Sequence, residues 1–168
     1  MTIAIRRLTA GELDAFARDL PAWNSTEYAE RLAAQERGEL VQVVAWDDRR
    51  AVGKAMVLFP EHEEYSESAE RERCAEVRDV EVAEQARRRG IGSAMIRALE
   101  DAARERGLSR IGMSFAIGED AGPAELVYGK LGYRRAHGPF IHSTDLPGDD
   151  GRPLHVGAVM AYLVKELV

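Results

Sequence analysis

The chain has 168 residues, of which 45% are hydrophobic and 31% charged, and this predicts one soluble domain. A chain of this length buries roughly 70% of the surface that its unfolded form exposes, so a hydrophobic core is expected. The net charge is −6, from 23 basic and 29 acidic side chains, which argues against general nucleic-acid binding. The single cysteine, Cys74, excludes an internal disulfide and a multi-thiolate zinc site.

The N-terminus has no long apolar stretch after a basic start, so no signal peptide is expected. No run approaches the roughly 18 apolar residues that would predict a membrane-spanning helix. A cytoplasmic location is therefore the default expectation, with no membrane partner.

The charge is distributed unevenly. Residues 61–70 contain five glutamates and neither lysine nor arginine, whereas residues 84–110 contain seven arginines against four acidic residues. This pattern is typical of a solvated loop beside an amphipathic helix. It would also suit a basic locus for an anionic ligand and an acidic locus for a cationic one.

Hydrophobic periodicity and turn residues predict alternating strands and helices, and they leave 61–70 and 138–155 as loops. In chain order the expected elements are strand 3–7, helices 10–20 and 25–38, strands 40–46, 51–59 and 74–82, helix 92–106, strand 109–117, helix 123–131, and strands 133–137 and 156–164. This order predicts a single α/β domain over residues 1–168. Its sheet is mixed but mostly antiparallel, with six or seven strands and about four flanking helices.

A glycine-bearing turn at 84–93 separates strand 74–82 from helix 92–106. Such a turn exposes backbone N–H groups at a helix start, and three successive arginines add positive charge, so a diphosphate site is predicted. A dinucleotide fingerprint would need glycine at Met95, and a P-loop would need a lysine that this turn lacks. The alternative is a tight turn with incidental glycines.

Two motifs resemble those of the GNAT superfamily of N-acetyltransferases. The first is Val80-x-Val82 followed by Arg87-x-x-Gly90-x-Gly92 and an amphipathic helix, similar to the acetyl-CoA-binding motif. The second lies about forty residues later and reads Ala124-x-x-x-Tyr128-x-Lys130-Leu131-Gly132-Tyr133. The expected order of elements also matches the family across nearly the whole chain, which implies a GNAT-like fold.

The resemblance implies acetyl-CoA as co-substrate, with the strand binding the pantetheine arm and the turn binding the diphosphate. The implied cofactor-binding residues are Val80, Val82, Arg87, Arg88, Arg89, Gly90, Ile91, Gly92 and Ser93. The chain departs from the family at Glu84, often proline, and at Ala121, often an asparagine that contacts the cofactor. The four histidines lack the spacing of a metal site, and no metal is expected.

An alkyl amine has a pKa of about 10.4, so the reaction needs a base to remove a proton at neutral pH. Glu76 is the first candidate, since it precedes Val82 by six residues, where family members such as histone acetyltransferases carry a glutamate. On a regular strand Glu76 shares a face with Arg78, Val80 and Val82. A bulge would reverse that parity, so Glu81 is the second candidate. Alternatively, Glu76 only pairs with a neighbouring arginine at an exposed strand start.

Tyr128 matches the tyrosine that protonates the CoA thiolate in the family, and the alternative is a core aromatic on a short amphipathic helix. A backbone N–H near Val82 is the implied oxyanion donor. Cys74 lies near the same strand, but no His–Asp partner is evident, and a buried structural thiol is the expectation.

The resemblance places the acceptor opposite the cofactor, between the early helices and loop 138–155, which contains Asp145, Asp149 and Asp150. We expect a cationic small-molecule amine or a peptide N-terminus, attracted by these carboxylates and by segment 61–70. One alternative is a non-catalytic acyl-CoA-binding regulatory module. Another is an RNA-modifying or toxin-type acetyltransferase, against which the acidic charge argues. A homodimer is left open.

Overall fold

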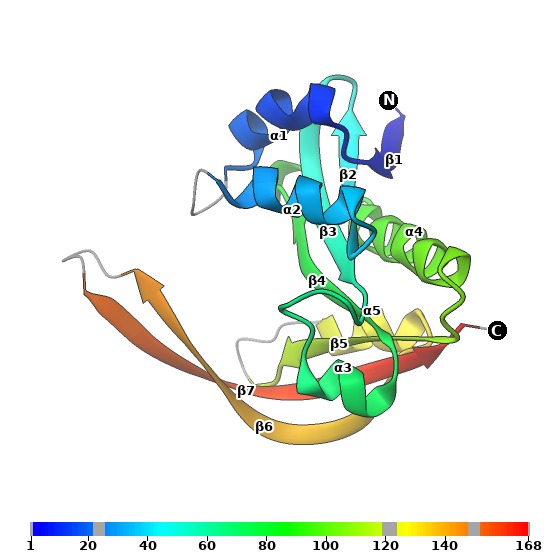
Figure 1. The fold of residues 1–168 in the computed structure, drawn as a ribbon, viewed down its shortest axis with the longest axis vertical. Helices are drawn as coiled ribbons and strands as arrows, with labels where there is room; N and C mark the ends of the chain where they lie inside the picture. Colours follow the sequence, from blue (N-terminus) through cyan, green and yellow to red (C-terminus); the bar gives the residue numbers. More distant parts are fainter. Residues whose placement is uncertain (1, 22–25, 119–123, 148–151, 168) are drawn as a thin grey trace.

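A seven-stranded sheet runs through the centre of the computed structural model, in the order β1-β2-β3-β4-β5-β7-β6 (Figure 1). The structure describes residues 2–21, 26–118, 124–147 and 152–167. Its strands are β1 (Ile3–Arg7), β2 (Leu40–Asp47), β3 (Arg50–Leu58), β4 (Ala75–Val82), β5 (Arg110–Ala116), β6 (Arg134–Pro147) and β7 (Pro153–Glu166). Its helices are η1 (Ala10–Glu12), α1 (Leu13–Asp19), α2 (Glu27–Glu36), α3 (Glu67–Glu72), η2 (Glu84–Ala86), α4 (Ile91–Glu105) and α5 (Ala124–Lys130).

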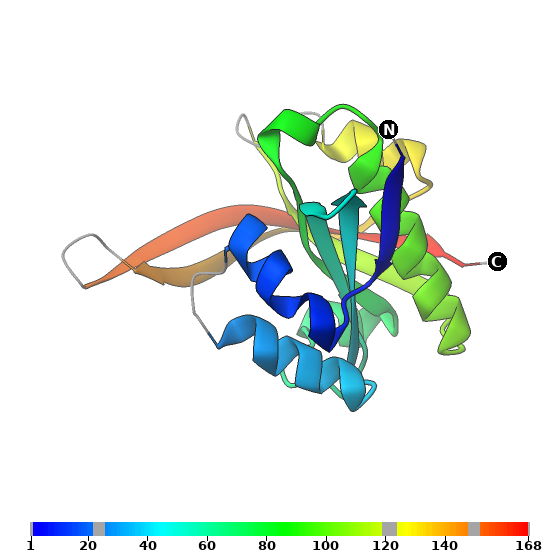
Figure 2. The same cartoon turned by 90° about the horizontal axis from the view of Figure 1, so that it is seen from above.

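Helices cover both faces of the sheet (Figure 2), as the alternation of apolar residues along the strands requires. On β2, Val43 faces one core cluster that includes Leu99 of α4. The next residue, Val44, faces the opposite cluster with Phe16 of α1 and Tyr28 of α2. Because successive side chains reach different layers, α4 and the α1–α2 pair lie on opposite sides of the same strands.

The second half of the sheet is covered in the same two-sided way. Tyr162 of β7 is fully buried and packs with Ala69 of α3, while the adjacent Leu163 joins the cluster on the α4 side. Tyr128 of α5 packs against the same α4-side cluster, which also contains Tyr133. Helices α3 and α5 therefore lie on opposite faces of the β5–β7 region.

Among the described residues, strands β4 and β5 form the one parallel pair of the sheet, and they pair only at their beginnings. The register joins Ala75 to Ile111 and Glu76 to Gly112 and then stops. Beyond that point β4 continues beside β3, whereas β5 continues beside β7. The two strands therefore diverge, and the divergence creates a space near the middle of the sheet.

The structure corrects three expectations from the sequence. Segment 61–70, expected as a loop, contains the start of α3, whose N-cap Ser66 accepts the Ala69 N–H at 3.1 Å. Segment 138–155, also expected as a loop, is mostly the β6–β7 hairpin, which pairs as far as Pro147 and Pro153. The expected helix 10–20 is divided into η1 and α1.

The physical reason for the hairpin error is the pair Gly138–Pro139, which predicts an end to a strand. The structure accommodates it with a register shift between His137 and Phe140, after which pairing resumes. Asp145 therefore lies in β6 rather than in a loop, and Asp149 and Asp150 lie outside the described residues. Within the described ranges, none of the helices is long and apolar enough to cross a membrane.

Candidate active site

The turn between β4 and α4 has the backbone geometry of an anion cradle. Gly90 is the N-cap of α4 and has a φ of 76°, a conformation that glycine adopts without strain. The first backbone hydrogen bond of the helix is donated by the Ala94 N–H to the Gly90 carbonyl, at 3.0 Å. The N–H groups of residues 91–93 precede that bond, so they have no acceptor within the helix and can bind an anion.

A cavity of about 340 Å³ opens at this turn, and most of the residues predicted to bind the cofactor line it. The lining residues among them are Val82, Arg87, Arg88, Gly90, Ile91, Gly92 and Ser93. Arg87 also donates from Nε to the Val82 carbonyl at 3.0 Å, which holds the turn against the end of β4. Arg89 does not line the cavity, since its guanidinium lies 3.6 Å from the carboxylate of Asp47.

A larger cleft of about 670 Å³ lies where β4 and β5 diverge. Val80 of β4, Ser114 of β5 and Tyr128 of α5 all line it. Val82, two residues after Val80, and Val127, directly before Tyr128, line the cavity at the turn. The cleft and the turn cavity are therefore neighbours along two shared elements.

Strand β4 contains the bulge that was considered from the sequence. Lys54 of β3 pairs with Glu81 and Met56 pairs with Arg78, so two residues of β4 oppose the single residue between them. One of the two, Asp79, has a φ of 58°, which is unusual outside glycine. The expectation of a regular strand, with Val80 and Val82 on the same face as Arg78, is therefore wrong. Glu81 instead faces the same side of the sheet as Arg78.

Glu76 lies on that same side, but it does not line the cleft. Its side chain is 1% exposed, so the strand start is buried rather than exposed. The carboxylate accepts hydrogen bonds from the N–H of Ser66 at 3.0 Å and from its hydroxyl at 2.7 Å, and a weaker one from Arg78 at 3.3 Å. Glu81 is about half exposed, and its carboxylate lies 3.3 Å from Nζ of Lys54.

Tyr128 is partly buried in the cleft wall, and its ring centroid lies 6.3 Å from that of Tyr133. Burial raises the pKa of its hydroxyl above the usual value near 10. The hydroxyl therefore stays protonated at neutral pH and is able to donate a proton.

Comparison with known proteins matches residues 7–133 to the Acetyltransferase (GNAT) family. The chain belongs to the GNAT acetyltransferase family. No curated protein sequence gave a significant match.

Several solved structures resemble the whole chain. An N-acetyltransferase from Staphylococcus aureus Mu50 superposes with a TM-score of 0.71 at 13% identity, covering 100% of both chains. The ribosomal-protein-S18-alanine N-acetyltransferase from Escherichia coli gives 0.63 at 16% identity, covering 99% of this chain and 94% of its own. A GNAT family acetyltransferase from Elizabethkingia anophelis with acetyl-CoA bound gives 0.59 at 16%, covering 98% and 97%. At these identities the likeness shows that the fold is shared.

The GNAT domain also contains a charged network on the α2 side of β4 that the sequence did not reveal. Lys54 is 7% exposed, its Nζ donates to the hydroxyl of Tyr28 at 3.0 Å, and it lies 3.8 Å from the carboxylate of Asp79. Asp79 lines the cleft and accepts a hydrogen bond from Arg31 at 2.6 Å. Burial alone would lower the pKa of Lys54, but Tyr28 and the two nearby carboxylates raise it overall.

No sequence signal predicted this network, because its members come from three separate segments. Tyr28 and Arg31 read as ordinary helix positions, and Lys54 as an ordinary strand position. Only the bulge at Asp79 brings its carboxylate to them.

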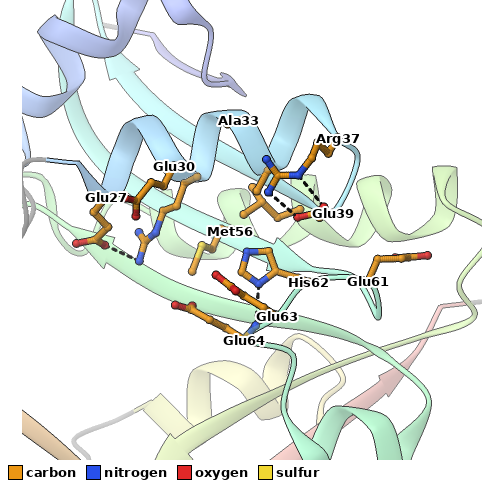
Figure 3. A pocket seen from close by; sticks show the side chains of 13 residues that line it. Glu27, Glu30, Ala33, Arg37, Glu39, Met56, Glu61, His62, Glu63 and Glu64 are labelled. Atoms are coloured by element: carbon orange, nitrogen blue, oxygen red, sulfur yellow. Dashed lines mark hydrogen bonds and ion pairs between the residues drawn. The ribbon is translucent and has the colours of Figure 1, made fainter.

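An acidic pocket of about 570 Å³ lies between α2 and the segment that follows β3 (Figure 3). Six glutamates and two arginines line it: Glu27, Glu30, Glu39, Glu61, Glu63 and Glu64, with Arg31 and Arg37. Glu30, Glu63 and Glu64 form no ion pair with any described residue. The Glu64 carbonyl accepts a hydrogen bond at 3.0 Å from Arg78, which lines the central cleft, so this pocket and the cleft are neighbours.

Cys74, directly before β4, is fully buried, as expected from the sequence. Its Sγ lies 3.5 Å from the hydroxyl of Tyr162. Burial raises the pKa of the thiol to about 11, which leaves almost no thiolate at neutral pH. In the described part of the chain, no three His, Cys, Asp or Glu side chains are arranged to bind a metal ion.

Proposed function

We propose that this GNAT protein transfers the acetyl group of acetyl-CoA to a primary amine by direct attack in a ternary complex. One observation carries the proposal: the anion cradle at the β4–α4 turn adjoins a cleft that is lined by Tyr128. An anionic nucleotide at the cradle would place the rest of the molecule in the cleft, where a proton donor is available.

The residues at the turn fit a diphosphate. Backbone N–H groups of residues 91–93 and the guanidinium groups of Arg87 and Arg88 border the same cavity. A Cβ at Gly90 would meet no atom within 4 Å, so the backbone is approachable from this side. Val80 and Val82 continue the site along β4, whereas Arg89 contributes positive charge from a position paired with Asp47.

Tyr128 is the proposed general acid. Its raised pKa keeps the proton on the hydroxyl until the thiolate leaves, and transfer to sulfur then completes the step. An oxyanion would be stabilised by a backbone N–H near Val82, at the edge of the diverging strands.

Glu76 is the proposed base, and the geometry indicates how a buried carboxylate could reach the acceptor. Ser66 lines the cleft, and its hydroxyl donates to Glu76 at 2.7 Å. A proton from the amine can therefore pass through the Ser66 hydroxyl to Glu76, without the carboxylate itself contacting the cleft. Glu81 remains the second candidate, although its nearest charged partner is Lys54.

The proposed acceptor is cationic, either a small-molecule amine or a peptide N-terminus. The acidic pocket beside the cleft supports this choice, because glutamates without ion pairs attract positive charge. A peptide N-terminus is further supported by the E. coli neighbour, which is named for an alanine of ribosomal protein S18.

The test is a screen for CoA thiol release with amines, polyamines, aminoglycosides and N-terminal peptides. We expect release with wild type and a loss of about 10²-fold or more in Glu76→Gln, a smaller loss in Ser66→Ala, and little change in Glu81→Gln. Binding of acetyl-CoA with no release for any amine would instead support a non-catalytic module. A loss confined to Glu81→Gln would transfer the role of base to Glu81.

A further inference from the structure

Three side chains beside the proposed acetyl-transfer site form a hydroxyl–imidazole–carboxylate array, and the hydroxyl belongs to a serine that lines the cleft of that site. Oγ of Ser68, on α3, lies 3.0 Å from Nε2 of His137, on β6. Nδ1 of the same ring lies 3.4 Å from a carboxylate oxygen, Oε1 of Glu72. In this order an imidazole can remove the hydroxyl proton while a carboxylate stabilises the resulting imidazolium.

The imidazole and the carboxylate are both held in place. The ring of His137 stacks on Tyr162, with centroids 5.2 Å apart and an interplanar angle of 12°. Its Nδ1 is buried and makes no regular hydrogen bond among the described residues, but it lies within ion-pair distance of the Glu72 carboxylate, at 3.4 Å. The second oxygen of Glu72 lies 3.1 Å from Arg110, which fixes the orientation of the carboxylate.

The serine, in contrast, faces the cleft. Ser68 lines the same 670 Å³ space as Tyr128, whereas His137 and Glu72 do not line it and lie behind the serine. Arg78 also lines this space, so the wall of the cleft includes a positively charged residue. A nucleophile at the wall with its base behind it is the arrangement that covalent catalysis requires.

We propose that Ser68 is a nucleophile activated by His137 and Glu72, and that it accepts the acyl group of a thioester bound in the cleft when no amine is present. The choice of an acyl-CoA thioester rests on the proposed function, whereas the activated serine does not.

The step balances as follows. Oγ of Ser68 bonds to the acyl carbon while its proton passes to Nε2 of His137. The C–S bond then breaks, and the sulfur leaves with that proton as a thiol. Water next gives a proton to Nε2 and adds as hydroxide to the ester carbon, and the serine oxygen leaves with the proton. The net reaction is hydrolysis of a thioester to a carboxylic acid and a thiol.

The first test uses a fluorophosphonate probe, which labels activated serines with release of fluoride, followed by peptide mapping. We expect label on Ser68 in wild type, none there in Ser68→Ala, and labelling about 10²-fold slower in His137→Gln. Glu72→Gln gives a second measurement if the histidine variant fails to fold, with about tenfold slower labelling expected. Ser114 lines the same cleft, so Ser114→Ala is the matched control and should retain the label on Ser68. No label on Ser68, or equal rates in wild type and both relay variants, would overturn the proposal.

The second test incubates the protein with acetyl-CoA and no amine. One acetyl group on Ser68 by mass spectrometry, or CoA release that Ser68→Ala abolishes, supports the thioester step, and the absence of both overturns it. Amine-dependent CoA release should fall no further in Ser68→Ala than in Ser114→Ala, a change at another serine of the same cleft, because direct transfer does not use the Ser68 hydroxyl. If no amine supports release but the fluorophosphonate labels Ser68, the proposed function fails while the activated serine stands.

Discussion

On the α4 side of the cleft between β4 and β5, the groups that would bind a ligand lie close together in the chain, between Val82 and Ser93. Most of them are backbone N–H groups, glycines and arginines. On the α2–α3 side, the cleft and the acidic pocket are built by side chains from α2, β4, α3 and the segment after β3. The first side depends on local conformation and the second on tertiary packing. A site built from neighbouring residues can be recognised as a motif with fixed spacing in the sequence, whereas a site assembled from distant segments cannot.

The two sides also differ in charge. Arg87 and Arg88 border the cavity at the turn, while six glutamates border the acidic pocket. The cleft between them would bring an anionic cofactor and a cationic acceptor together, each on the side that attracts it.

Tyr128 lies between the two sides, and its removal should have the largest effect. Tyr128→Phe is expected to lower kcat by about 10²-fold with little change in KM, because only the departing thiolate uses its proton. Tyr133→Phe is the matched control, since Tyr133 lies nearby but donates to Glu100. Equal kcat losses in both variants would indicate a packing role for Tyr128.

The pH profile sharpens this prediction. Burial raises the pKa of Tyr128, so the acid form persists to higher pH than in a free tyrosine. Wild-type kcat should therefore show no fall from this group below about pH 10. A descending limb near pH 8 that disappears in Tyr128→Phe would contradict the assignment.

Gly90→Val tests the cofactor side by itself. A left-handed φ of 76° with a β-branched residue costs roughly 1–2 kcal/mol, and displacement of the N–H groups should weaken acetyl-CoA binding about tenfold. Gly107→Val is a close control, because Gly107 lies beyond the other end of α4 with a φ of 82° and equal space for a Cβ. The dissociation constant for acetyl-CoA is measured for both variants by calorimetric titration. Equal weakening in both would indicate general strain in α4 rather than a displaced turn.

Charge reversal tests the acceptor side. Glu63→Lys with Glu64→Lys should raise KM for a cationic acceptor about fivefold at low salt, and less at high salt, with kcat nearly unchanged. Glu36→Lys with Glu105→Lys makes the same change in net charge at residues that do not line the pocket. An equal rise in KM for both double variants would show that net charge, rather than the pocket, attracts the acceptor.

The smallest expected effect is the alkylation rate of the Cys74 thiol. Because Cys74 packs with Ala69, this rate reports whether α3 stays packed on the sheet. With a pKa of about 11, its thiolate fraction at pH 8 is about 10⁻³, and the buried thiol should resist iodoacetamide. Ser143→Cys supplies an exposed thiol on β6 for comparison and should react quickly. Rapid native-state labelling of Cys74 would mean that α3 opens easily.

Much of the fold followed from the sequence because local signals agreed with tertiary packing. β1 begins and ends where alternation predicts, and α4 runs within one residue of the predicted range. The β6–β7 hairpin was underestimated because Gly138 and Pro139 suggested a loop, although a register shift lets pairing continue past them. Helix α3 was missed because six residues are too few for a clear helical period.

Most of the residues predicted to bind the cofactor line one cavity at the turn, since they are nearly consecutive in the chain, and their role in binding stays a prediction. The surroundings of Glu76 could not be predicted in the same way. Its partner Ser66 lies in a segment that the sequence suggested was a solvated loop, and its burial depends on α3 covering β4. The relay behind Ser68 joins positions 68, 72 and 137, which no local motif connects.

The bulge in β4 also gives the strand a spare residue. If Asp79 were deleted, the remaining order Glu76, Val77, Arg78, Val80, Glu81 and Val82 would alternate as a regular strand, with each side chain on the face that it occupies now. The core and the pairing of Arg78 with Met56 and of Glu81 with Lys54 would be preserved, because one β4 residue would then oppose one residue of β3. This one-residue deletion would thus remove the Asp79 carboxylate from Lys54 and Arg31 without exchanging core and surface side chains.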